Sequence, residues 1–237
     1  MRKITINLAA VAAFCIVVAS PALVSSSCAT PKTEQEDTTI IREDSGITAL
    51  KYSSPEVPAS IEFCGKTIDL SRFDRHERMD RELLAFTYMH STSLQMLKKA
   101  NRYFPIVEPI LKENGIPDDF KYLMVIESNM NPTARSSAGA AGLWQFMQGT
   151  GRDYGLEVNN NVDERYHIEK ATRAACRYLK DAYAKYKDWV AVAASYNAGQ
   201  ARIASQLAKQ DVDDSLDLQL VEETARYVYR ILAAKQL

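Results

Sequence analysis

Glu127 follows four apolar residues, 123–126, close to the expected end of a helical segment. A carboxyl group in such surroundings either meets a partner or has its pKa raised by desolvation, which would make it a proton donor near neutral pH. A glutamate at a helix end is, however, usually a solvated or capping group. The pattern around Glu127 therefore makes acid–base catalysis a candidate without deciding it.

Three later segments carry side chains typical of sugar-binding sites. Residues 142–147 combine an amide with aromatic and thioether groups, residues 194–199 end a helix on a tyrosine and an asparagine, and residues 223–228 form a helical turn. Apolar faces stack on sugar rings, and amides bond to hydroxyls. Each segment also has an ordinary explanation, namely core aromatics, an Asn-Gly helix stop and a solvated helix face.

The order of the four segments is more specific than any one of them, because together they resemble the soluble lytic transglycosylase family, which shares a lysozyme-like fold. The family pattern has a catalytic Glu followed by Ser, then Gly-Leu-Met/Trp-Gln, Ala-Tyr-Asn-Ala-Gly and Glu-Thr-x-x-Tyr-Val. The matching positions are Glu127-Ser128, Gly142-Leu143-Trp144-Gln145, Ser195-Tyr196-Asn197-Ala198-Gly199, and Glu223-Thr224 with Tyr227-Val228.

The resemblance covers about residues 100–235, and residues 150–156 are most similar to the membrane-bound lytic murein transglycosylase D branch. Two positions depart from the family pattern. Ser195 replaces the usual Ala, and Tyr229 stands where many relatives have Pro. The position of the catalytic Glu is intact, so the resemblance still implies an active enzyme.

The implied activity is cleavage of the β-1,4 bond between N-acetylmuramic acid and N-acetylglucosamine in peptidoglycan. Glu127 would protonate the glycosidic oxygen and then, as a carboxylate, remove the proton from the muramoyl C6 hydroxyl, which closes a 1,6-anhydro ring without water. Such a tethered nucleophile gains from proximity. The resemblance implies a set of substrate-binding residues and no cofactor or metal. That set is Ser128, Gln145, Phe146, Tyr196, Asn197, Glu223 and Tyr227.

Two other functions stay open from the sequence. A hydrolytic muramidase on the same fold would use water, although ordinary glycosidases need two carboxylates and the resemblance supplies one. A peptidoglycan-binding lipoprotein without activity is the alternative outside the enzymes, and the intact Glu127 argues against it. Other chemistries find little support, since the three histidines are widely spaced and Ser128 lacks the Gly-x-Ser-x-Gly elbow.

The elements that must position these side chains are expected to be helices, so the predicted fold class is all-α. Helical spacing marks residues 83–97, 104–111, 120–130, a helix beginning near 142, 163–186, 189–198 and 220–234. Asp118 or Asp119 is expected to cap the third of these, and Asp188 the sixth, which Gly199 closes. Residues 61–70 are expected to be extended or to form a small hairpin.

The N-terminal region predicts export from the cell. Arg2 and Lys3 precede an apolar run over residues 8–18 and then small residues, which is the layout of a secretory signal peptide. The run is shorter than the roughly 20 residues of a spanning helix. Cys28 follows three serines and resembles a lipoprotein acylation site, although the usual Leu three places earlier is absent. Ordinary cleavage nearby is equally open.

The expected organisation is a signal peptide over residues 1–27, a flexible tether over 28–60, an N-terminal helical extension over 61–99 and a catalytic domain over 100–237. The expected partners are peptidoglycan glycan strands and, through a possible lipid on Cys28, a membrane. The expected location is therefore the periplasm or cell envelope.

The net charge bears on nucleic-acid binding, and the cysteine count bears on a possible disulfide. The formal charge of −1 becomes −3 without residues 1–27, which carry two positive and no negative side chains. Nucleic acid is therefore an improbable partner, because it requires a basic surface. Beyond Cys28 only Cys64 and Cys176 remain. In an oxidising compartment these two could form a disulfide.

Overall fold

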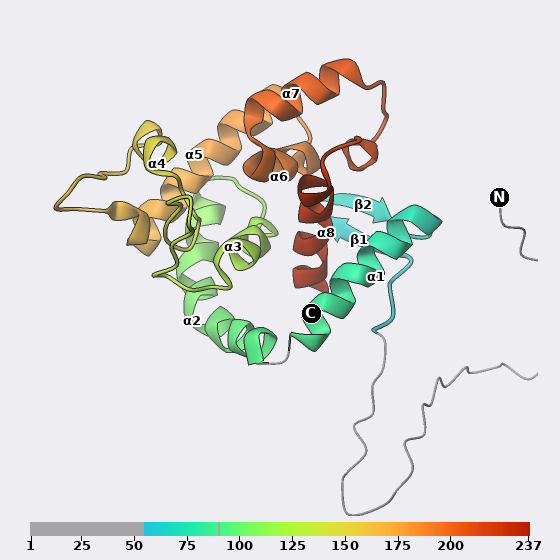
Figure 1. Cartoon of the computed structure of the whole chain (residues 1–237), viewed down its shortest axis with the longest axis horizontal. Helices are drawn as coiled ribbons and strands as arrows, with labels where there is room; N and C mark the ends of the chain where they lie inside the picture. The colour runs from blue at the N-terminus through green and yellow to red at the C-terminus, as the bar shows by residue number, and fades with distance from the viewer. Residues whose placement is uncertain (1–54, 90) are drawn as a thin grey trace, which may run out of the picture. The chain divides into compact units, whose positions relative to one another are not determined.

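The structure, a computed structural model, describes residues 55–89 and 91–237 (Figure 1). The predicted signal peptide, Cys28 and most of the tether lie outside these residues. The described chain forms a β-hairpin, eight α-helices and two 3-10 helices. In order they are β1 (Ser60–Phe63), β2 (Lys66–Asp69), α1 (Phe73–Tyr88), α2 (Ser91–Glu113), α3 (Phe120–Ser128), α4 (Gln148–Asp153), η1 (Glu164–Tyr166), α5 (Ile168–Tyr186), α6 (Trp189–Ala198), α7 (Gln200–Lys209), η2 (Ser215–Asp217) and α8 (Glu222–Gln236).

The predicted helical class is confirmed, and so is the small hairpin before it. β1 and β2 pair antiparallel with Ile61 opposite Ile68. Cys64 and Gly65 join them with φ values of 53° and 81°, as a two-residue turn that twists with its strands requires. The inward side chain of Phe63 packs on Phe120, with ring centroids 6.0 Å apart, so the hairpin covers the start of α3.

The first two helices divide at a different place from the one predicted. α1 ends at Tyr88 and α2 begins at Ser91, so residues 94–97 belong to α2 and not to the first helix. α2 then continues through Pro105 and Pro109 to Glu113. The apolar spacing on both sides of the break is helical, and for that reason spacing alone placed the boundary too late. The expected domain boundary at residues 99 and 100 lies inside α2.

Helix α3 ends where the sequence indicates, but its predicted cap is wrong. Asp119 precedes the helix without a side-chain capping bond. Its carboxylate instead accepts from the backbone N–H of Cys64 at 2.6 Å and pairs with Lys235 at 2.7 Å. Asp119 therefore joins the hairpin, α3 and α8. The left-handed Asn129, with φ 49°, ends the helix directly after Ser128.

Helix α6 matches the prediction at both ends. The Asp188 carboxylate accepts from the N–H of Val190 at 2.8 Å, and Gly199 follows the helix with φ 85°. The chain then enters α7, which the sequence analysis did not foresee. α5 is likewise shorter than expected, because residues 164–166 form the separate 3-10 helix η1.

The last helix, α8, completes the domain. It packs against α1, α3 and α6 (Figure 1). It is therefore held by elements from the beginning, the middle and the later part of the chain. No helix in the part of the chain that the structure describes is long and apolar enough to cross a membrane.

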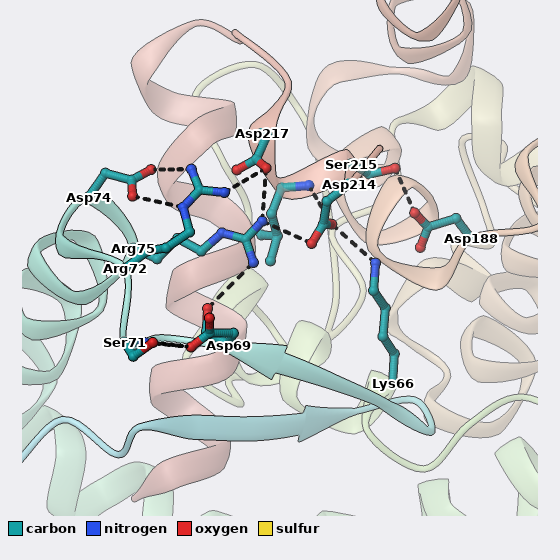
Figure 2. Close-up of polar contacts among 11 residues, drawn as sticks. Lys66, Asp69, Ser71, Arg72, Asp74, Arg75, Asp188, Asp214, Ser215 and Asp217 are labelled. Atoms are coloured by element: carbon teal, nitrogen blue, oxygen red, sulfur yellow. Dashed lines mark hydrogen bonds and ion pairs between the residues drawn. The ribbon is translucent and has the colours of Figure 1, made fainter. Parts of the chain in front are cut away.

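A polar network fastens the N-terminal hairpin and α1 to η2 (Figure 2). The guanidinium of Arg75, whose side chain is only 6% exposed, bonds to the carboxylates of Asp214 at 2.9 Å and Asp217 at 3.0 Å. Arg72 adds a bond to Asp217 and Lys66 one to Asp214. Since η2 leads into α8, this network fixes the approach of the chain to its last helix.

The two remaining cysteines are free thiols, so the structure does not contain the disulfide considered from the cysteine count. Cys64 lies in the hairpin turn, beside Asp119. Cys176 is buried on α5 with its sulfur toward the carbonyl of Ile110 on α2. The two residues have different surroundings, and burial raises the pKa of both thiols, that of Cys176 to about 11.

Candidate active site

Glu127 lies in the last turn of α3, half-buried, with its carboxyl group toward α8. The four preceding residues are all buried, so this end of the helix is packed into the core. The hydroxyl of Tyr227 on α8 donates a short hydrogen bond to Oε1 of Glu127. The two residues therefore lie in direct contact, and their roles in the reaction stay a prediction.

Burial is the main cause that raises the pKa of Glu127, to about 7. The hydrogen bond from Tyr227 and the positive charge of Arg230 act in the opposite direction, while the negative charge of Glu223 adds to the rise. A carboxyl group with a pKa near 7 can give up a proton and take one back at neutral pH. Tyr227 stays a donor throughout, because its own pKa is raised well above its usual value by burial.

The segment around Gln145 is a tight loop, so the predicted helix start near Gly142 is wrong. Gly142 and Gln145 have φ values of 78° and 47°, both incompatible with a right-handed helix. The loop is closed by bridges from Ala141 to Arg135 and to Phe146, and α4 begins only at Gln148. The amide nitrogen of Gln145 donates to the carbonyl of Gly142 at 2.7 Å. The Gln145 side chain thus stabilises the loop to which it belongs.

Arg165 is hydrogen-bonded to the backbone of this loop, and the sequence analysis did not single out this residue. Its buried guanidinium donates to the carbonyls of Gly139 at 2.8 Å and Phe146 at 3.0 Å, and it pairs with Asp163. The backbone carbonyl of Arg165 also lies where a Cβ on Gly142 would be, 1.9 Å from that position. The only signal in the sequence was an arginine beside an aspartate, and this is too common to single out.

Tyr196 connects α6 to the same loop. Its hydroxyl donates to the carbonyl of Trp144 at 2.8 Å, and its ring packs on that of Phe146 at 6.2 Å. Trp144 itself is fully buried, with its indole N–H bonded to Thr172 on α5 at 2.9 Å. Burial raises the pKa of Tyr196 well above its usual value, and the charge of Glu127 adds to the rise. Tyr196 is thus an electrostatic neighbour of Glu127.

Asn197 ties α6 to α8 beside the site. Its side-chain oxygen accepts from the hydroxyl of Thr224 at 2.8 Å, and its amide nitrogen donates to Glu223 at 3.4 Å. Thr224 is buried, whereas Glu223 is exposed. The Asn197 side chain therefore orders the first turn of α8, from which Glu223 and Tyr227 extend.

The structure brings four of the predicted residues together at Glu127 by contact or charge, namely Tyr196, Tyr227, Glu223 and, through Glu223, Asn197. Ser128 and Phe146 are buried, as Tyr227 is, but neither side chain is hydrogen-bonded to Glu127. The Ser128 hydroxyl donates to the carbonyl of Met124 in its own helix. These two side chains support the site from inside the fold and present little surface to a sugar.

Metal-binding residues do not gather in the described part of the chain. Over residues 55–89 and 91–237, no group of three His, Cys, Asp or Glu side chains is arranged to hold a metal ion.

Residues 105–217 match the family model of the transglycosylase SLT domain. The chain is 30% identical over 166 residues to the membrane-bound lytic murein transglycosylase D of Escherichia coli, covering 68% of this chain and 36% of that protein. It is 29% identical over 150 residues to the membrane-bound lytic murein transglycosylase C of Haemophilus ducreyi, covering 57% and 40%. The chain thus spans well under half the length of these two relatives.

Among solved structures, the lytic transglycosylase Slt of Pseudomonas aeruginosa matches with a TM-score of 0.48 and 22% identity, covering 69% of this chain and 30% of that one. The family match covers the first three of the four segments and confirms the family resemblance and, with the helical architecture, the predicted lysozyme-like class. Glu223 and Tyr227 lie beyond the matched residues.

Proposed function

Because this chain carries a transglycosylase SLT domain, we propose that it is a peptidoglycan lytic transglycosylase that cleaves the bond between N-acetylmuramic acid and N-acetylglucosamine and leaves 1,6-anhydro ends. The observation that carries the proposal is the environment of Glu127. One half-buried carboxyl group has a pKa near 7 and accepts a hydrogen bond from a tyrosine that remains protonated.

This environment suits a group that must act first as acid and then as base. With a pKa near the working pH, Glu127 is protonated in a large fraction of molecules and can donate to the glycosidic oxygen. The carboxylate left behind is stabilised by the Tyr227 hydroxyl, and this lowers the cost of the donation. The same carboxylate then removes the proton of the C6 hydroxyl as the anhydro ring closes.

Contacts to the glycan are assigned to the less buried residues at the site. Gln145 and Tyr196 are half-buried and Glu223 is exposed, so parts of each are accessible to a sugar. Gln145 is held in place by its own loop, and Tyr196 by the Trp144 carbonyl. Both are therefore ordered before substrate binds, which reduces the entropy lost on binding.

The hydrolytic alternative would need a second carboxylate to activate water. Glu223 is the candidate, because its charge acts on Glu127. Glu223 is exposed on the first turn of α8, however, and its Oε1 accepts a hydrogen bond from the amide of Asn197 on α6. We favour transglycosylation, since intramolecular attack by the C6 hydroxyl requires one carboxyl group, as found at Glu127.

Mass spectrometry of the products from purified sacculi tests the proposal directly. Anhydro-muropeptides lighter by one water than the hydrolysed products are expected. Hydrolysed ends would establish a muramidase instead. The absence of released glycan from folded protein would contradict both enzymatic functions and favour a binding protein.

A cell-envelope location follows from the proposed substrate. Two of the matched relatives are named as membrane-bound transglycosylases. The signal-like segment over residues 1–27 and a lipid on Cys28 would account for export and anchoring here. Metabolic labelling with a radioactive fatty acid tests the anchor, and a Cys28→Ser variant should lose the label.

A further inference from the structure

Helix α8 carries the tyrosine that contacts Glu127, yet it lies outside the residues matched by the family model. α8 packs on α1, which lies outside the matched residues as well, on their N-terminal side. A forked ion pair joins the two helices: Glu82 on α1 is 1% exposed, and its partner on α8 is Arg226, with a side chain 38% exposed. The two carboxylate oxygens of Glu82 accept from Nε and Nη2 of Arg226 at 2.7 and 3.2 Å.

We propose that Glu82 is a positioning residue for the reaction, because by holding Arg226 in a forked pair it fixes α8 in the orientation that keeps the Tyr227 hydroxyl on Glu127. For its activity readout the inference rests on the proposed function. The structural part, from Glu82 to Glu127, does not.

The geometry explains why such a pair controls orientation. Arg226 and Tyr227 are neighbours on one helix, separated by about 100° of rotation and 1.5 Å of rise. Any turn or slide of α8 that moves one therefore moves the other. The hydrogen bond to Glu127 fails once its donor moves by about an ångström. A forked pair restricts both rotation and sliding, which an apolar contact of equal area would not.

Charged and titratable groups reach Glu127 from two elements. Tyr227, Arg230 and Glu223 belong to α8, and Tyr196 belongs to α6. A displacement of α8 by about an ångström breaks the hydrogen bond but keeps Glu127 covered, so burial, the largest cause of its raised pKa, stays in place. Such a displacement weakens the two effects that lower this pKa, which come from Tyr227 and Arg230, together with the smaller effect of Glu223 that raises it. The expected net result is a higher pKa for Glu127.

A second ion pair between the same helices provides a matched control. Arg81 bonds to Glu222 at 2.8 Å, but their side chains are 45% and 70% exposed. Arg81 also lies 3.3 Å from the carboxylate of Glu82, and Glu222→Gln leaves that contact and the Glu82–Arg226 pair in place. Exposed pairs of this kind hold geometry weakly. Removing the charge of Glu222 should therefore leave α8 where it is, although this residue also joins α1 to α8.

The experiment compares the full chain with Glu82→Ala, Glu222→Gln, Tyr227→Phe and the double variant Glu82→Ala/Tyr227→Phe. The carboxyl ¹³C resonance of Glu127, identified by its loss in Glu127→Gln, is titrated by NMR. The kcat and KM for glycan strands are measured in parallel. Where Glu82→Ala does not fold, Glu82→Gln keeps the side-chain volume and serves in its place.

Glu82→Ala should raise the titration midpoint of Glu127 by roughly half a unit or more and lower kcat about five- to tenfold, with little change in KM. The double variant should resemble Tyr227→Phe alone, since effects transmitted through one contact do not add. Glu222→Gln should match the wild type in each measurement.

A Glu82→Ala protein whose melting temperature falls while the Glu127 titration stays unchanged would overturn the proposal and leave Glu82 a purely stabilising residue. Additive effects in the double variant would overturn it too. A shifted titration in a chain that releases no glycan would instead uphold the positioning role and contradict the proposed function.

Discussion

Tyr227 and Glu127 are 100 residues apart in the chain, and the hydroxyl of the first donates directly to the carboxyl group of the second. The bond joins the ends of two separate stretches of the fold, α3 and α8. It opposes the effect of burial on the Glu127 pKa and leaves that pKa near 7. The chemistry of the site therefore depends on the packing of the last helix as well as on the glutamate.

Replacing Glu127 by Gln should abolish glycan cleavage while the protein stays folded. The amide has nearly the same shape but cannot donate or accept the proton that the reaction moves. General acid–base groups contribute about 10²–10⁴-fold, and a loss of at least this size is expected. Release of soluble muropeptides from sacculi measures it, with circular dichroism as the folding control. A variant that keeps wild-type activity would remove Glu127 from the mechanism.

The same substitution should change how stability depends on pH. Between 4.5, the ordinary value, and about 7, the folded state keeps a proton on Glu127 that the unfolded state has lost. Wild-type stability therefore falls as the pH rises through this window. Above pH 7 Glu127→Gln should be more stable than wild type by about 1–3 kcal/mol, with little difference below pH 4.5. Urea unfolding at pH 4 and pH 8 measures it, and equal differences at both would contradict the raised pKa.

Tyr227→Phe removes the hydrogen bond to Glu127 and keeps the ring. Because that bond lowers the Glu127 pKa, its loss should raise the pKa and move the high-pH fall of the rate to higher pH. The carboxylate formed on proton donation also loses its donor, so the maximal rate should drop about tenfold. A pH–rate profile measures both effects. An unshifted profile would show that the Tyr227 hydroxyl does not stabilise the carboxylate form of Glu127.

Glu223→Gln separates the two enzymatic readings of the site. If the C6 hydroxyl is the nucleophile, the variant should still release anhydro products, at a somewhat altered rate, since no second carboxylate is required. If water is the nucleophile and Glu223 its base, cleavage should fall by about 10²-fold or more. The product masses and rates from the same digestion decide between them.

Gly142→Ala tests the backbone of the loop that presents Gln145. An added Cβ would lie 1.9 Å from the carbonyl oxygen of Arg165, at a φ of 78°. The backbone would have to shift, so a loss of about 3 kcal/mol or more is expected. Gly149→Ala is the control, because its Cβ meets nothing within 4 Å in helix α4. Thermal unfolding of both variants measures the contrast, and equal melting temperatures would refute the strain at Gly142.

Local signals predicted what local interactions determine. Asp188 and Gly199 delimit α6 as expected, because a cap and a left-handed stop act within a few residues. The apolar run before Glu127 likewise indicated either a partner or a raised pKa for its carboxyl group, and the structure has both. The positive φ of Gln145 had no such signal, since glutamine rarely adopts it. The loop around it is held by Arg165 and Thr172, which come later in the chain.

Contacts between residues far apart in the chain could not be predicted, because no local pattern marks them. Glu82 and Arg226 are 144 residues apart, and each by itself looks like an ordinary helical charge. The carboxylate of Asp119 has the spacing of a helix cap but serves the hairpin and Lys235 instead. The candidate site residues were predicted from the family pattern. The contacts that orient them required the folded structure.

The contact between Lys235 and the hairpin has a consequence for how the domain folds. Lys235 on α8 donates to the carbonyl of Glu62 on β1, 173 residues earlier. Closing so long a loop is entropically costly, and contacts of this separation form late in folding. A chain emerging from the ribosome cannot make this contact until α8 is free of it. The domain should therefore stay loosely structured during synthesis and acquire its ordered site only after α8 has been released.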